Sequence, residues 1–201
     1  MIKRFLIILI LIINLPNLSF ADDIRDFQIE GMSIGDSLLD YMSAKRIKEM
    51  FVLTKDHYKY LKKPHKFREV YIFSNPNFET YRSVSFFVKP NDKNYIIFAI
   101  RGLKTYINGM DKCLKKQKEI ANEIKNIIPK FTKRENNIKS PLDKSGKSVF
   151  KNLTFIFEPG DGIVISCNDW EEKLRNKKNW TEGLSVGIRK KEVADWFDNK
   201  K

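Results

Sequence analysis

Ser37 is the residue of this chain whose setting most suggests chemistry, because it stands in the run Gly-Asp-Ser-Leu. A serine hydroxyl is a poor nucleophile at neutral pH unless a neighbouring base removes its proton. The chain has two histidines, His57 and His65, and neither follows an aspartate by three residues, the spacing that would orient a base for Ser37. We therefore predict that this run begins a helix, with catalysis by Ser37 as the alternative.

The residues Gly35, Asp36, Ser37, Leu38 and Asp40 resemble the nucleophile block of the GDSL serine hydrolases. The resemblance implies an esterase in which Ser37 attacks an ester carbonyl while a histidine near the C-terminus takes its proton. It also implies a doubly wound fold with a mostly parallel sheet. The chain departs from the family because no histidine follows His65. In addition, Ser166 replaces the glycine of the family's Gly-x-Asn-Asp block at Asn168-Asp169. The alternative interpretation is structural, with Ser33 or Asp36 capping a helix.

Residues 1–21, MIKRFLIILILIINLPNLSFA, have the pattern of a secretory signal peptide with small residues before the cut site. The apolar run from Phe5 to Leu15 has 11 residues, whereas a membrane-spanning helix needs roughly 20. We predict cleavage before Asp22, a single domain over residues 22–201, and a periplasmic or secreted location. The phrase IEGMSIGDSLLDY, residues 29–41, also resembles the N-terminal part of small exported bacterial proteins of uncharacterised function.

The net charge of +13 is concentrated in residues 104–151, which hold 13 basic and 5 acidic residues. Such a region suits an acidic partner protein or an anionic envelope surface. Of the 38 basic residues 29 are lysines, and this fact supports a second interpretation, that the region is merely a solvated surface. Nucleic acid is disfavoured as a partner by the predicted export and by the few arginines available for phosphate recognition.

Two cysteines, Cys113 and Cys167, lie in the part of the chain that we expect to be exported. Thiols oxidise in that compartment, so the sequence predicts one disulfide between them. Neither histidine stands near a cysteine or at a spacing that recurs in metal sites. We therefore expect no metal and no cofactor.

Hydrophobic periodicity predicts an α+β domain with an antiparallel sheet of about six strands. One long helix, residues 110–128, and short helices between Gly35 and Met50 are expected to pack on one face of the sheet. The strands are expected at residues 67–73, 81–88, 95–106, 149–158, 162–167 and 184–189, with a polar loop at 130–147 and a short terminal helix at 190–197.

Two further sequence patterns are typical of binding sites. The run Ser145-Gly146-Lys147-Ser148 looks like the end of a phosphate-binding loop, but Pro141 stands where that motif needs its first glycine. The aromatic residues Trp170, Trp180, Trp196, Tyr58 and Tyr60 suit either a platform for a sugar or peptide, or covers for the ends of a core.

The sequence therefore favours a non-catalytic exported binding or interaction protein. A GDSL-type serine esterase using Ser37 is the alternative.

Overall fold

The computed structural model describes residues 24–199 except 74, 129, 141 and 179, so the predicted signal peptide lies outside the described residues. The strands are β1 (Gln28–Ile29), β2 (Met32–Ser33), β3 (Arg68–Phe73), β4 (Ser83–Val88), β5 (Ile97–Thr105), β6 (Thr132–Lys139), β7 (Val149–Ile156), β8 (Gly162–Asp169) and β9 (Gly183–Arg189). The α-helices are α1 (Ala44–Leu53), α2 (Met110–Ile127), α3 (Glu172–Lys178) and α4 (Lys191–Asp198), and short 3₁₀ turns occupy Ile24–Asp26 and Leu38–Asp40.

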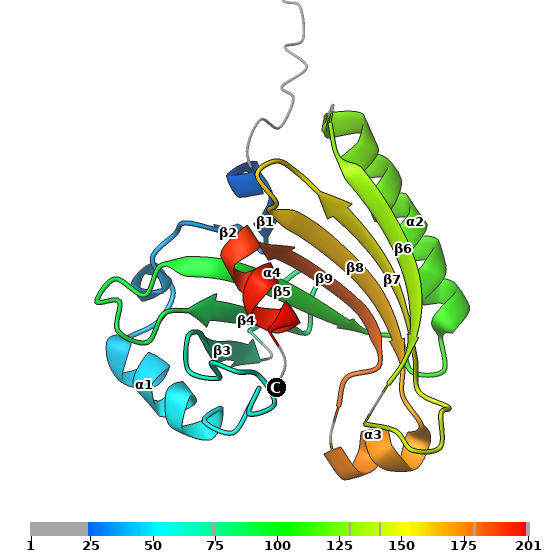
Figure 1. The fold of residues 1–201 in the computed structure, drawn as a ribbon, viewed down its shortest axis with the longest axis horizontal. Coiled ribbons are helices and arrows are strands. Elements are labelled where there is room, and N and C mark those ends of the chain that lie inside the picture. Colours follow the sequence, from blue (N-terminus) through cyan, green and yellow to red (C-terminus); the bar gives the residue numbers. More distant parts are fainter. Residues whose placement is uncertain (1–23, 74, 129, 141, 179, 200–201) are drawn as a thin grey trace, which may run out of the picture.

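The main sheet is antiparallel and has the strand order β3-β4-β5-β9-β8-β7-β6. It contains seven strands in place of the six expected, and β1 and β2 pair separately as a short hairpin. The last strand, β9, inserts between β5 and β8, so it joins the two halves of the sheet. Figure 1 shows the resulting curvature, with α2 on the convex side. The α+β class and the antiparallel sheet are confirmed.

The convex face carries the larger core, and the disulfide lies within it. Helix α2 buries Cys113, Gln117, Ala121 and Ile124, which recur at spacings of three and four residues and so form one stripe. Cys113 is bonded to Cys167 of β8, with 5.8 Å between the Cα atoms. Helix α1 adds Ile47 and Met50 to the same core. The disulfide and the placement of α1 and α2 on one face are therefore as predicted.

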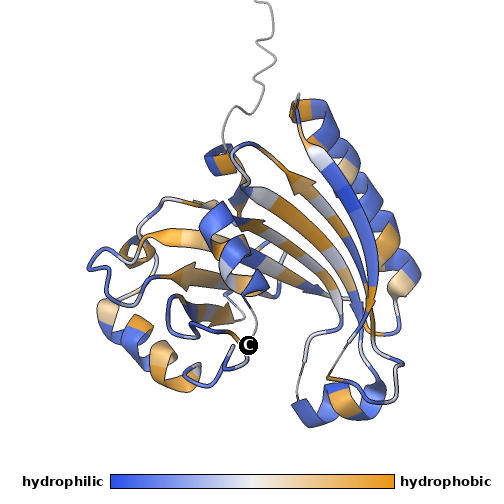
Figure 2. Cartoon of the chain, viewed as in Figure 1, coloured by the Kyte–Doolittle hydropathy of each residue, from blue (hydrophilic) through white to orange (hydrophobic). Residues whose placement is uncertain are grey.

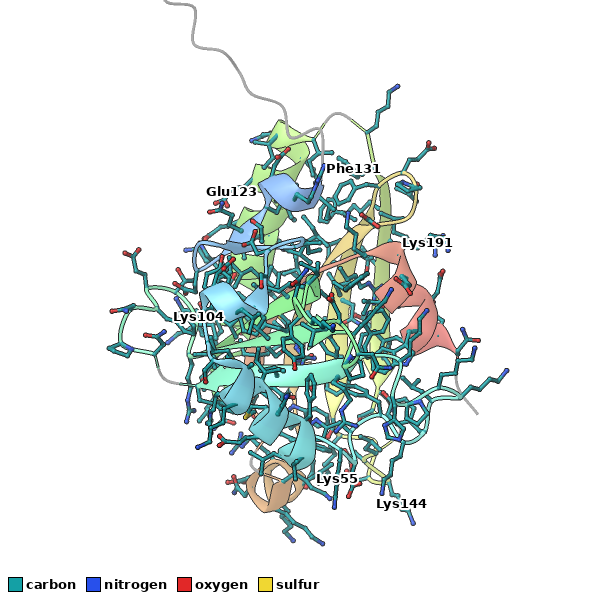
Figure 3. All side chains as sticks on the ribbon, turned by 90° about the vertical axis from the view of Figure 1, so that its left-hand side faces the viewer. Lys55, Lys104, Glu123, Phe131, Lys144 and Lys191 are labelled. Carbon is teal, nitrogen blue, oxygen red and sulfur yellow. A yellow bond between two sulfur atoms is a disulfide. The ribbon has the colours of Figure 1, made fainter. Side chains whose placement is uncertain are left out.

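The predicted terminal helix is α4, and it packs on the concave face, opposite α1 and α2. There Val193 and Trp196 of α4 contact Phe87 of β4 and Ala99 of β5. Figure 3 shows Lys191 at the start of α4 on one side of the sheet and Glu123 of α2 on the other. The Trp196 indole donates to the carbonyl of Lys63 over 2.7 Å, which fixes the C-terminal helix against the segment before β3.

The prediction of a polar loop at 130–147 is wrong for residues 132–139, which form β6. All eight residues of this strand are exposed, and most of its length is hydrophilic (Figure 2). Its stability comes from pairing with β7 over eight residues rather than from burial, and no hydrophobic alternation marks it. Charged side chains on an edge strand also oppose pairing with other chains.

Among the helices of the described residues, none combines the length and the hydrophobicity of a membrane span.

Candidate functional site: a hollow on the concave face

A hollow of about 230 Å³ lies on the concave face beside α4. Its floor is formed by the central strands, where the pairing places Gly187 opposite Arg101 and Arg189 opposite Ala99. Ser185 and Ser166 lie opposite each other on β9 and β8 and continue the floor. Because each arginine faces a glycine or an alanine across the ladder, space remains above the middle of the sheet.

A buried ion pair stands beside the hollow and fixes one of its arginines. The Glu69 side chain is 0% exposed and accepts a hydrogen bond from the Arg101 guanidinium over 2.6 Å, whereas the Arg101 side chain remains 33% exposed. Arg101 also donates from Nε to Ser85 over 3.2 Å. The Tyr58 hydroxyl donates to the second Glu69 oxygen over 2.9 Å, and the His57 ring lies 3.2 Å from that same oxygen.

The network keeps the Glu69 carboxylate ionised and paired with Arg101, and it does not favour proton transfer. Burial opposes ionisation of Glu69, but Arg101 and the hydrogen bonds from His57, Tyr71 and Tyr58 outweigh it and lower the pKa of the carboxyl. The charge of Glu69 raises the pKa of Arg101 despite burial. A carboxylate with a lowered pKa and four partners has little basicity to offer a substrate. The pair therefore serves to orient the Arg101 guanidinium beside the hollow.

Arg189 is the second cation at the hollow. Among the described residues it forms no ion pair, and Asp198 acts on it only through longer-range attraction. Arg189 is partly buried, and this burial lowers the pKa of its guanidinium from the usual value. The site thus contains one matched and one unmatched positive charge.

The rest of the lining is divided between apolar and polar groups. Phe87 and Phe197 are aromatic residues at the end of the hollow where α4 packs. At the other end, the Ser166 hydroxyl lies 2.5 Å from the Asn152 side-chain oxygen and 2.6 Å from that of Asn168. Clefts with apolar walls and a few fixed polar groups are the usual form of small-molecule sites.

Ser37 lies outside this hollow. It caps the turn Leu38–Asp40, since its hydroxyl oxygen accepts from the Leu39 N–H over 3.2 Å and its hydrogen is donated to the Asn94 carbonyl over 2.7 Å. The prediction of a helix start at this run is confirmed, although the cap is Ser37 and not Ser33 or Asp36. In the described chain His57 bonds to Glu69 and His65 to Arg68, so the structure brings neither histidine to Ser37.

Replacing Ser37 with alanine is expected to lower the free energy of unfolding by about 1 kcal/mol, the usual effect of losing a helix cap. Urea unfolding of the wild type and Ser37→Ala measures this difference. We expect Ser37→Ala to leave the rate of p-nitrophenyl acetate hydrolysis at the wild-type value. Wild-type hydrolysis above the buffer rate that Ser37→Ala abolishes, without loss of stability, would favour the esterase.

The polar side chains of residues 29–41 mainly form hydrogen bonds that stabilise the fold. The Glu30 carboxylate accepts three hydrogen bonds from the backbone N–H groups of residues 79–81. Asp36 accepts from the Ser33 N–H and from the Tyr41 hydroxyl, both at one oxygen. Burial and the neighbouring Asp36 raise the pKa of Tyr41 to about 12. These contacts give the segment a structural role without any ligand.

The run Ser145 to Ser148, which resembles the end of a phosphate-binding loop, surrounds the side-chain carboxylate of Asp143. The Asp143 carboxylate accepts from the backbone N–H groups of Ser145, Lys147 and Ser148 over 2.7–3.0 Å. These are the donors that would otherwise face a phosphate. The Asp143 carboxylate therefore occupies the backbone donors that a phosphate would need.

The aromatic residues do not form one platform. Trp196 is 2% exposed and belongs to the core under α4, where Tyr58 packs against it with 5.2 Å between ring centroids. Trp170 and Trp180 form a separate pair at 4.3 Å, and Trp170 also contacts Phe150 of β7. Trp196 therefore covers part of a core, which is the second of the two interpretations of these aromatic residues.

A second groove, of about 550 Å³, lies between α2 and the strands β6 and β7 and is lined by four lysines of the basic region. The lysines that line it are Lys118, Lys125, Lys133 and Lys151. Glu135 also lines it and pairs with Lys133. The lysines lie on the outer edge of the molecule, where water and salt screen them.

Within the described ranges, no three His, Cys, Asp or Glu side chains come together as they would to hold a metal ion. Comparison of the chain with protein-family models, with curated proteins and with solved structures finds no significant match.

Sequence reasoning missed the residues of the concave hollow. Glu69 and Arg101 are charges of opposite sign placed within two apolar strands, and such placement signals a buried pair. Arg189 and Gly187 carried no comparable signal, because each resembles an ordinary residue near the end of a strand.

Proposed function

We propose that the mature chain, residues 22–201, is a non-catalytic, periplasmic or secreted binding protein that holds a small molecule in the concave hollow. The observation that carries the proposal is the floor of small residues on the central strands, which runs from Ala99 beside α4 through Gly187 to Ser185, opposite Ser166. Central strands normally carry large side chains that fill the space under a helix. A small molecule would fill the space that these residues leave.

The charge network supports binding over catalysis. Arg101 is oriented by Glu69 and Ser85 before any ligand arrives, which reduces the entropy that binding would cost. The predicted signal peptide and the disulfide support export. The resemblance of residues 29–41 to small exported proteins agrees with this location.

A second candidate function is docking of an acidic protein or an anionic envelope surface on residues 104–151. The four lysines of the groove between α2 and β6 favour it. This function and small-molecule binding use opposite faces of the sheet, so a map of the bound surface separates them.

Gly187→Leu is expected to abolish small-molecule binding by filling the hollow. A Cβ atom at position 187 would meet its nearest neighbours at 3.9 Å, an ordinary contact, so the backbone tolerates a side chain there. Native mass spectrometry of protein purified without denaturation from its own envelope should show a bound small molecule on the wild type and none on Gly187→Leu.

The matched control is Thr154→Leu, which adds a similar side chain to the same face on β7 without lining the hollow. This variant should keep the bound molecule, and circular dichroism should show both variants folded. A wild type that carries no small molecule, even after incubation with envelope extract, would contradict the proposed function. Equal loading of all three proteins would place the ligand elsewhere.

A further inference from the structure

Arg189 is a cation at the hollow whose charge, among the described residues, is offset only by the longer-range attraction of Asp198. Its side chain lines the hollow, and no ion pair to it forms among the described residues. By contrast, Lys190, the next residue, pairs with Asp161 over 2.8 Å and helps to hold the start of α4. A partly buried guanidinium without a partner costs free energy, because the protein replaces its water shell incompletely. An anion from outside the chain would supply the missing partner.

The charges around the hollow fix how much negative charge the occupant can carry. Arg101 and Arg189 are diagonal neighbours on β5 and β9, a relation that brings Cα atoms to about 7–8 Å. Glu69 already neutralises Arg101. Asp198 attracts Arg189 but does not line the hollow, so the lining has one positive charge without a paired anion, which suits a singly charged ligand. A dianionic phosphate monoester would leave a net negative charge in a partly desolvated place.

The uncharged lining indicates what else the ligand contains. Phe197 offers an apolar surface at the end near Arg189, backed by the buried ring of Phe87 with 5.4 Å between the ring centroids. At the far end, Ser166 of β8 offers hydrogen bonds together with Asn152, which faces it on β7, and Asn168, which lies two residues further along β8. An apolar body attached to a carboxylate matches the first end, and a hydroxyl or amide on that body matches the second.

We infer that the ligand of the concave hollow is a small monocarboxylate with an apolar body, and that Arg189 binds its carboxylate. This inference rests on the proposed function and adds the chemical class of the ligand to it. A guanidinium presents two parallel N–H donors that match the two oxygens of a carboxylate, so arginine suits this role better than lysine. Arg101, fixed by Glu69, forms the adjacent wall.

The test is calorimetric titration of the purified mature protein with a panel of aliphatic, aromatic and hydroxylated monocarboxylates. The panel includes each acid's primary amide and the matching phosphate monoesters. The proteins compared are the wild type, Arg189→Gln, Arg189→Lys and the control Arg134→Gln. Arg134 lies on the exposed edge strand β6, in the same row across the sheet as Gly187 and Arg101. Its loss removes one positive charge from the same face without touching the hollow.

We expect at least one acid to bind the wild type while its amide binds about tenfold more weakly or worse, the usual loss for a charge-assisted hydrogen bond. Arg189→Gln should lose that preference, Arg189→Lys should retain part of it, and Arg134→Gln should match the wild type. Amides that bind as well as acids, phosphate esters that bind more tightly, or unchanged binding by Arg189→Gln would each overturn the inference. Failure of every acid to bind would overturn it too. In each of these cases the molecule found by native mass spectrometry, and its loss in Gly187→Leu, would still decide the proposed function separately.

Discussion

Replacing Glu69 with alanine is expected to lower the free energy of unfolding by about 3 kcal/mol, near the lower end of the range for breaking a buried ion pair. The Glu69 side chain is fully buried and accepts hydrogen bonds from Arg101, Tyr58 and His57. Its removal leaves the Arg101 guanidinium and the Tyr58 hydroxyl without their acceptor. We choose the lower end because Arg101 is one third exposed, so water can solvate part of the charge that remains.

Urea unfolding of the wild type, Glu69→Ala and Glu135→Gln measures this effect. Glu135 also pairs with a cation, Lys133, but on the exposed strand β6, and its loss should change stability by about 0.5 kcal/mol or less. Equal effects of Glu69→Ala and Glu135→Gln would show that the buried network contributes no more than a surface pair.

The lowered pKa of Glu69 adds a pH dependence to this prediction. A carboxyl whose pKa is lower in the folded state stabilises the fold above its ordinary pKa of 4.5, and the stabilisation is lost as the pH falls through the folded value. The difference in stability between the wild type and Glu69→Gln should therefore be largest near neutral pH and should shrink below pH 4.5. A difference that grew on acidification would contradict the assigned direction.

Removal of the disulfide is expected to lower the free energy of unfolding by up to about 4 kcal/mol. Cys113 and Cys167 are 54 residues apart in sequence, and the chain-entropy model gives a value near this size for closing such a loop. The bond also joins α2 to β8 within the convex core, so reduction removes a link between helix and sheet.

Urea unfolding of the oxidised protein, the reduced protein and the double variant Cys113→Ala, Cys167→Ala measures this contribution. The reduced protein and the double variant should unfold at similar urea concentrations, both well below the oxidised protein. Peptide mapping of the unreduced wild type should recover the two cysteines in one linked pair. Two free thiols in folded protein, or no change on reduction, would contradict the arrangement of α2 on β8.

Most of the architecture could be predicted from residue patterns, and the exceptions have physical causes. Helix α2 carries a stripe of buried residues at helical spacing, so the sequence predicted its position to within one residue. Strand β6 carries no pattern, because all of its side chains face water and its partner strand alone holds it in place. The face that α4 covers depends on where β9 enters the sheet. β9 pairs with β5, which lies far from it in the sequence, so local residue patterns do not predict this position.

The candidate site was harder to predict because its parts come together through strand order. Arg101 and Arg189 are 88 residues apart in the sequence and become diagonal neighbours only when β9 pairs with β5. Gly187 matters for the space it leaves, and an absent side chain gives no chemical signal in a sequence. By contrast, the conspicuous run around Ser37 serves as a cap. The residues with the most suggestive types were therefore not the ones that line the hollow.

The most direct test of the account is to map the surface that a ligand contacts, by amide chemical-shift changes in isotope-labelled mature protein. The protein would be titrated with the small-molecule extract of its native envelope, and Gly187→Leu would be titrated in parallel. Binding in the concave hollow predicts shifts along β5, β8, β9 and α4 in the wild type and their loss in Gly187→Leu. Shifts confined to α2 and β6, unchanged in Gly187→Leu, would contradict it and would place binding on the basic groove.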